Sequence, residues 1–191
     1  MTTDASVYLS ELGRLIGTME IRDQTGKNFS LDDGGRVALD LISEAKRQKA
    51  KAIVVGNGGS AAIASHMQND LCKAVKMRAL VFTEQSLLTA LANDDGYQTA
   101  YETLTELWTE PNDLLIAISS SGRSENILRA AAMVRRAGGH IITMSGFAPD
   151  NPLRGLGDIN FYVPSDSYGH VEVVHAALGQ FLTDALMVKK T

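Results

Sequence analysis

The sequence has little of what marks secreted or membrane-spanning chains. Its 191 residues include one cysteine, Cys72, so no disulfide can form within the chain. Cys72 lies in an apolar helical pattern, which predicts a small buried side chain rather than a reactive thiol. No segment reaches the roughly 18 consecutive apolar residues of a membrane span, and the first 15 residues lack the basic start and apolar block of a signal peptide. These absences predict a cytoplasmic protein without a membrane partner.

An excess of positive charge is also missing. The formal net charge is -4, whereas direct binding to nucleic acid requires a basic face. Hydrophobic residues make up 45% of the chain and charged residues 21%, which is typical of a globular protein. No linker, repeat or low-complexity tract divides the sequence, so we expect a single domain over residues 1–191 with no direct nucleic-acid partner.

The first 50 residues carry two helical patterns. Tyr8, Leu12 and Leu15 recur at helical spacing, and Ser30 with Asp33 three residues later resembles the capping box of a second helix. We expect an N-terminal helical layer at 1–50, before any strand, whose apolar faces serve either the core or a partner subunit in an oligomer.

Short apolar runs alternate with helical patterns over the rest of the chain. The runs lie at 52–55, 78–82, 114–119, 140–144 and 159–163, and a last helix is expected from about 171 to 188. Apolar runs without alternation are typical of strands buried on both faces. The pattern predicts an α/β fold over residues 51–191, with a doubly wound sheet of five parallel strands flanked by helices.

Two polar loops follow neighbouring strands of this predicted sheet. The first contains Asn57, Gly58, Gly59 and Ser60; the second contains Ser119, Ser120, Ser121 and Ser124. Each loop opens a helix, so hydroxyl groups and free backbone N–H groups can converge on an anion. An ordinary tight turn and a solvated loop with a serine cap are the structural alternatives. Because ligands bind beyond the carboxyl ends of such strands, the pair of loops predicts a phosphate site.

Three segments resemble the SIS family, and among its members most closely the phosphoheptose isomerases. They are GNGGSAAIASH at 56–66, ALANDDGY at 90–97 and AISSSGRSENI at 117–127. Those enzymes convert sedoheptulose 7-phosphate to D-glycero-D-manno-heptose 7-phosphate. The resemblance implies a homotetramer with pockets between subunits, in which the two loops hold phosphate and sugar. It also makes Asn93 and Asp94 candidates for binding the sugar, with helix capping as the alternative role of Asp94.

The resemblance further implies a zinc ion. His66 and Asp70 are four residues apart and share one helix face; the matching family residues are a histidine and a glutamate that bind zinc, the glutamate also being the catalytic base. Glu172 and Gln180 stand where the family has a glutamine ligand and a histidine that is both ligand and acid. The implied ligands are therefore His66, Asp70, Glu172 and Gln180, although the last two lie about 12 Å apart along a helix axis. Without the family, a surface hydrogen-bonded pair is the simpler interpretation of His66 and Asp70.

Several departures from the family leave two functions open. Gln180 donates a hydrogen bond but not a proton, so His175 or His170 is the candidate acid. Other positions differ as well: Ile63, Arg123 and Gly169. The first interpretation is a ketose–aldose isomerase with Asp70 as base. The alternative is a non-catalytic SIS protein that binds a sugar phosphate or a protein partner, as the DnaA initiator-associating protein does.

Overall fold

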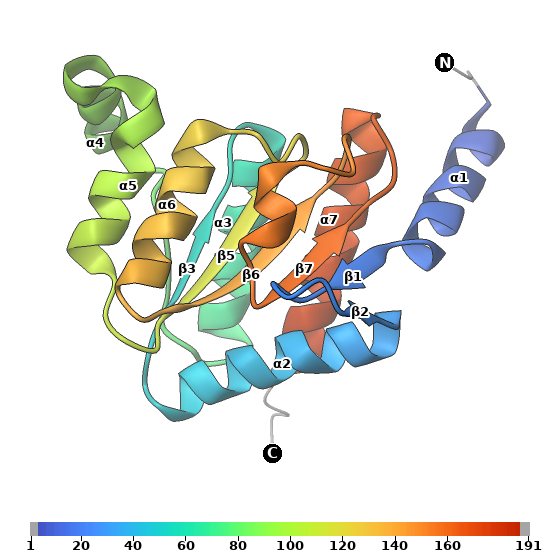
Figure 1. The fold of residues 1–191 in the computed structure, drawn as a ribbon, viewed down its shortest axis with the longest axis horizontal. Helices are drawn as coiled ribbons and strands as arrows, with labels where there is room; N and C mark the ends of the chain where they lie inside the picture. The colour runs from blue at the N-terminus through green and yellow to red at the C-terminus, as the bar shows by residue number, and fades with distance from the viewer. Residues whose placement is uncertain (1–3, 188–191) are drawn as a thin grey trace.

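Five central parallel strands form where the apolar runs lie. The computed structural model describes residues 4–187, and its seven-stranded sheet has the order β2-β1-β7-β6-β5-β3-β4 (Figure 1). The parallel strands are β3 (Ala52–Val55), β4 (Ala79–Val81), β5 (Leu114–Ser119), β6 (His140–Ser145) and β7 (Ile159–Tyr162). All residues of β3, β5 and β7 are buried, as expected for strands covered on both faces.

An N-terminal hairpin extends the sheet, so the expectation that no strand precedes the parallel core is wrong. Strands β1 (Glu20–Arg22) and β2 (Asn28–Phe29) pair antiparallel, and β1 also pairs antiparallel with β7. The Asp23 carboxylate accepts backbone N–H groups of Thr25 and Lys27 and closes the turn. With only Ile21 buried, β1 is too short to give an apolar run in the sequence.

Helices cover both faces of the sheet. On one face, α2 (Leu31–Arg47), α3 (Gly59–Lys73) and α7 (Tyr168–Asp184) share a hydrophobic core with the strands. On the other lie α4 (Gln85–Leu91), α5 (Tyr97–Trp108) and α6 (Glu125–Arg136). A π-helical segment, η1 (Ala92–Gly96), joins α4 to α5, and a 3-10 turn, η2 (Pro152–Gly155), precedes β7.

The two N-terminal helices differ in what they contact. Helix α2 begins at the predicted cap, where Ser30 Oγ accepts the Asp33 N–H at 3.1 Å, and its apolar face packs into the core. Helix α1 (Ala5–Gly17) packs against α7 and projects from the body of the molecule (Figure 1). It buries Leu12 and Leu15 and leaves other apolar side chains exposed: Val7, Leu9 and Ile16.

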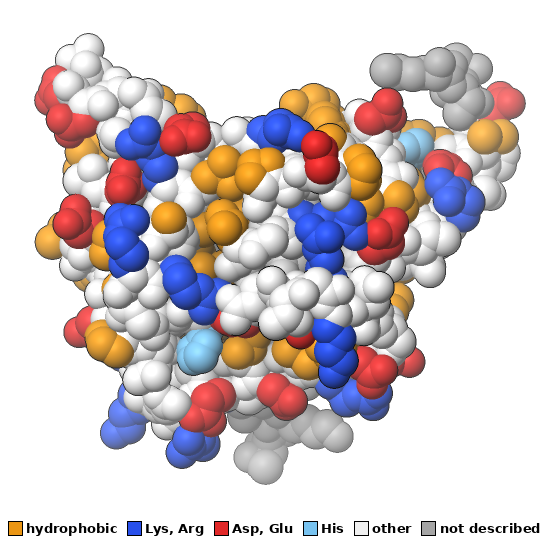
Figure 2. Space-filling view, viewed as in Figure 1, with side chains coloured by type: hydrophobic (Ala, Val, Ile, Leu, Met, Phe, Trp, Pro, Cys, Tyr) orange, Lys and Arg blue, Asp and Glu red, His pale blue; other side chains and the backbone are white. Residues whose placement is uncertain are grey.

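The surface agrees with the composition. Basic and acidic side chains intermingle over the face seen in Figure 2, without a broad patch of either sign. Between residues 4 and 187 no helix combines the length and apolar character needed to cross a bilayer. Cys72 is exposed, which corrects the expectation that it is buried; it lies on α3, and its Sγ is 3.6 Å from the carbonyl oxygen of Ala79 in β4.

Candidate functional site

A small cavity lies at the carboxyl edge of the sheet. It measures about 120 Å³ and is bounded by three loop-to-helix junctions. Its lining consists of Asn57, Ser60, Ser119, Ser120, Ser121, Ser124, Tyr168 and Glu172. All of these except Tyr168 are predicted site residues. Tyr168 was missed because only the fold brings the start of α7 against the serine loop; its place just after the last parallel strand is the one sequence signal.

The serine loop presents hydroxyl groups to this cavity. Ser119 and Ser120 are each 5% exposed, and the Ser119 and Ser124 hydroxyl oxygens are 3.2 Å apart. Ser120 Oγ is buried and has no hydrogen-bond partner among the described residues. A buried hydroxyl without a partner is costly, so this atom is available to a ligand.

A glycine gives the serine loop its shape. Gly122 has φ +61°, and a Cβ at this position would overlap the Asn151 side chain. Asn151 is buried, and its amide donates to Ser145 Oγ at 3.3 Å and to the carbonyls of Gly146 and Ala148. Asn151 therefore stabilises the conformation of the serine loop, and no motif in the sequence predicts this role.

A hydrogen-bond network fixes the glycine-rich loop. The side-chain amides of Asn57 and Asn126 bond reciprocally at 2.9 and 3.0 Å, and the Tyr97 hydroxyl donates to Asn57 Oδ1 at 2.7 Å. The Tyr101 hydroxyl donates to the Gly56 carbonyl at 2.8 Å. Burial, reinforced by neighbouring Tyr97, raises the pKa of Tyr101, which keeps this donor protonated. Asn126, Tyr97 and Tyr101 come from helices α6 and α5, so sequence analysis of the loop itself missed them.

Glu172 closes the cavity from α7. Its carboxylate lies against Gly59 at the start of α3, where any Cβ would overlap it. Gly58 begins this helix with φ +54°, a conformation that glycine adopts readily. The two adjacent glycines thus serve different purposes, since one turns the chain and the other makes room for Glu172.

His66, Asp70 and Gln180 meet farther along α3 and α7. His66 Nε2 lies 3.0 Å from Gln180 Oε1 and 3.4 Å from Asp70 Oδ2. The Gln180 amide donates to Asp184 Oδ1 at 2.7 Å, which turns its oxygen toward His66. Three of the four predicted metal ligands are therefore adjacent, and Glu172 is not with them, since it borders the serine cavity two helical turns earlier.

This donor set does not fit a zinc ion. Structural and catalytic zinc sites use at least three strong donors from His, Cys, Asp and Glu. Here one imidazole and one carboxylate meet a neutral amide, and no group of three such side chains between residues 4 and 187 is arranged to hold a metal. The arrangement is instead a polar cluster in which His66 Nε2 lies near both Asp70 and Gln180, and the Gln180 amide in turn bonds to Asp184.

The remaining candidates lie outside the cavity. His175 is fully buried, with Nε2 3.2 Å from the Ser145 carbonyl oxygen, so it cannot reach a substrate in this structure. His170 stacks on Tyr8 of α1, with ring centroids 4.3 Å apart. Asn93 and Asp94 are exposed on η1 and bond to each other. Three departures from the family pattern point elsewhere: Ile63 packs against the core, Arg123 pairs with Asp150, and Gly169 lies beside Tyr8.

Comparisons with known proteins agree with this architecture. The sequence matches the SIS domain family over residues 31–146. It is 34% identical to the phosphoheptose isomerase of Akkermansia muciniphila, covering 81% of this chain and 82% of the relative. It is 31% identical to that of Helicobacter pylori strain Shi470, with 82% and 84% covered. A solved phosphoheptose isomerase from Francisella tularensis superposes with a TM-score of 0.83 at 23% identity, covering 97% and 98%. The chain belongs to the SIS domain family and, within it, to the phosphoheptose isomerases.

Proposed function

We propose that this protein isomerises sedoheptulose 7-phosphate, or a related ketose phosphate, to the corresponding aldose phosphate. The observation that carries the proposal is the convergence of Asn57, Ser60 and the serine loop on one cavity at the carboxyl edge of the sheet. This is the place where α/β sheets of this type bind ligands. Relatives more than 30% identical carry the isomerase name.

Neutral donors hold the phosphate in this proposal. Helices α3 and α6 both begin at the cavity, so their free N–H groups and dipoles favour an anion there. The serine hydroxyls add donors, with Ser120 Oγ still without a partner in the described chain. Arg123 is engaged by Asp150 at 3.0 Å, so the phosphate is recognised without a cation from this loop.

Proton transfer is assigned to the other end of α3. Isomerisation requires a base that removes a proton from C1 of the ketose and returns it at C2, through an enediolate whose oxygens accept hydrogen bonds. Six residues separate Ser60 from His66, about 9 Å along the helix, a span that suits an open-chain sugar anchored by its phosphate. Asp70 is the proposed base, and His66 beside it is the proposed donor to the substrate oxygens.

Other parts of the proposal come from the family resemblance. We propose a cytoplasmic homotetramer in which the N-terminal segment 1–50, and α1 above all, contributes the subunit contacts. The exposed apolar residues of α1 support this assignment. Zinc has no part in the proposed steps, because the donor set does not fit it.

Turnover of sedoheptulose 7-phosphate by the intact protein tests the proposal. We expect aldose phosphate to form, with loss of at least tenfold in kcat in His66→Ala and in Asp70→Asn. Ser121→Ala removes a hydroxyl from the phosphate site and should weaken substrate binding by about 1 kcal/mol or more. Ser43 is an exposed serine on α2, so Ser43→Ala is the matched control; it should change neither kcat nor the affinity for the substrate.

A second function would explain one observation better. Gln180 is held between His66 and Asp184 and cannot act as an acid, which favours a protein that binds a sugar phosphate without converting it. Binding of sedoheptulose 7-phosphate that is sensitive to Ser121→Ala, without turnover of any ketose phosphate, would replace the isomerase assignment with this one.

A further inference from the structure

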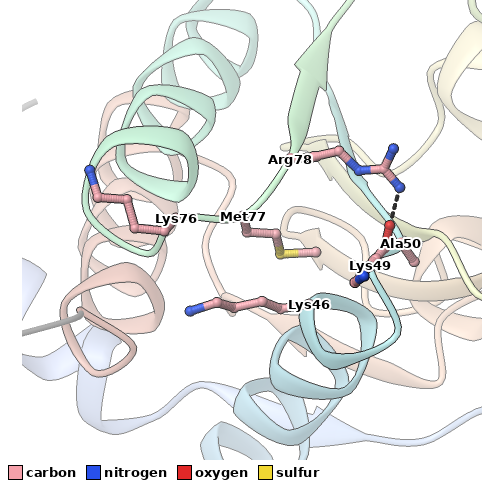
Figure 3. Close-up of a pocket in the computed structure, with 6 residues that line it drawn as sticks. All are labelled: Lys46, Lys49, Ala50, Lys76, Met77 and Arg78. Carbon is pink, nitrogen blue, oxygen red and sulfur yellow. Dashed lines mark hydrogen bonds between the residues drawn. The ribbon is translucent and has the colours of Figure 1, made fainter.

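A second depression lies at the opposite edge of the sheet from the serine cavity. It measures about 450 Å³ and is formed where α2 ends and where the chain passes from α3 to β4 (Figure 3). Its lining consists of Lys46, Lys49, Ala50, Lys76, Met77 and Arg78. The length of β3, about 13 Å, separates this edge from the glycine-rich loop that borders the serine cavity.

The four cations of this depression are not neutralised by neighbouring acids. Within the described chain, none of Lys46, Lys49, Lys76 and Arg78 lies within ion-pair distance of a carboxylate. Two acidic groups adjacent in the sequence or at the start of a neighbouring strand pair with other cations, Glu44 with Arg47 at 2.5 Å and Asp113 with Lys51 at 2.6 Å. The C-termini of α2 and α3 each contribute about half a negative charge. The four positive side chains exceed the sum of these two partial charges.

The backbone places two of these lysines in an unusual conformation. Lys49 and Lys76 have φ values of +59° and +60°, in the left-handed region that glycine adopts without steric cost. Both follow the end of a helix, where glycine is the common residue. The Arg78 guanidinium donates to the Lys49 carbonyl and ties the two turns together (Figure 3). The presence of lysine rather than glycine at both turns therefore indicates that the lysine side chains have a function.

The shape of the depression limits what it can hold. Lys46 and Lys76 lie on either side of Met77, which is 3% exposed, and their ammonium groups extend toward the same side (Figure 3). No aromatic side chain lines it, so it offers no platform for stacking a nucleobase. Clustered ammonium groups bind phosphate as point charges.

We propose that this depression binds a small anion that carries several phosphate groups in a row. Such a ligand carries negative charge for more than one of these cations, whereas the serine cavity offers neutral donors suited to one phosphate. The proposal is independent of the isomerase assignment, because it uses none of the residues of the serine cavity.

Calorimetric titration of the intact protein with inorganic tripolyphosphate tests this site at low ionic strength. We expect saturable binding that weakens at least tenfold in the double variant Lys46→Gln/Lys76→Gln. Lys73→Gln is the matched control, since Lys73 lies in the last turn of α3 and outside the depression; it should change the affinity less than twofold.

Two results would overturn the proposal. The first is absence of tripolyphosphate binding to the wild type; if the double variant then also has a lower oligomer mass, the depression is a contact between copies of the chain. The second is an equal loss of affinity in Lys73→Gln and in the double variant, which would show a diffuse positive field rather than a site. Circular dichroism of each variant establishes that it is folded.

Discussion

At the scale of single residues, two buried polar atoms without partners in the described chain have different surroundings. Ser120 Oγ lines the serine cavity, where a ligand can supply the missing hydrogen bond. His175 Nδ1 lies in the core behind that cavity, on a fully buried side chain. The first atom belongs to a residue that lines the proposed binding site, whereas the second belongs to a core residue whose burial bears on stability.

The burial of His175 predicts a dependence of stability on pH. Burial lowers the pKa of His175 from 6.5 to about 4, so between these values the unfolded chain binds a proton that the folded chain does not. The free energy of unfolding should therefore fall as the pH drops from 6.5 toward 4, by about 3 kcal/mol in all. Urea unfolding of the wild type and of His175→Gln at several pH values measures this. The variant should lose less stability over the same range, and parallel curves would contradict the prediction.

Gln180 is the residue that keeps the α3–α7 cluster from fitting a metal. Gln180→His would place a second imidazole opposite His66, near the position that Oε1 holds at 3.0 Å. With Asp70 this makes three strong donors, so we expect the variant to hold zinc near one equivalent per chain. The wild type should hold much less, as measured by elemental analysis after gel filtration.

The Gln180→His variant should also gain activity that chelation removes, because it regains a group that titrates near neutrality. Equal metal content in both proteins would contradict this account.

At the scale of secondary-structure elements, a buried ion pair joins the starts of β3 and β5. Lys51 Nζ lies 2.6 Å from Asp113 Oδ2, and Asp113 Oδ1 accepts the Lys51 backbone N–H at 2.8 Å. Burial alone would lower the pKa of Lys51, but its bonds to Asp113 and Glu110 outweigh it and raise that pKa. Lys51 therefore stays charged, and its bonds to Asp113 hold two adjacent parallel strands in register.

Removing one member of this pair should be costly. Lys51→Met leaves the Asp113 carboxylate buried without its cation, and we expect a loss of about 3 kcal/mol in the free energy of unfolding. Glu110→Gln is the control, because the Glu110 side chain is 71% exposed; its loss should stay below about 1 kcal/mol. Guanidinium unfolding monitored by circular dichroism compares the three proteins. Similar losses of unfolding free energy in Lys51→Met and Glu110→Gln would show that the buried contact of Lys51 with Asp113 contributes little to stability.

At the scale of the whole molecule, α1 packs on α7 but projects from the body (Figure 1), and it exposes apolar side chains. Leu9 is 62% exposed and Val7 52%. A second copy of the chain would bury this face in the proposed tetramer. Leu9→Glu should then lower the mass measured by light scattering at micromolar concentration, whereas Arg14→Ala, which removes only an exposed ion pair with Glu11, should not. A wild-type monomer would contradict the proposal.

The linear sequence determined the parallel core and the serine cavity. Apolar runs mark β3, β5, β6 and β7 because strands buried on both faces need uninterrupted apolar side chains. The serine and glycine loops could be predicted because each carries its donors within a few residues and opens a helix. Carboxyl ends of neighbouring parallel strands must meet at one edge, so the two loops were bound to converge.

Only the tertiary structure decided the rest. The β1–β2 hairpin was missed because three residues with one buried side chain carry no periodic signal, and it forms because β7 offers an edge. Helical spacing showed that His66 and Asp70 share a face, but the packing of α3 on α7 brought Gln180 to them and left Glu172 at the cavity. His175 was a plausible acid in the sequence and is a core residue in the fold. Which side chains meet across two helices depends on how their surfaces interlock, and no local pattern in the chain encodes that contact.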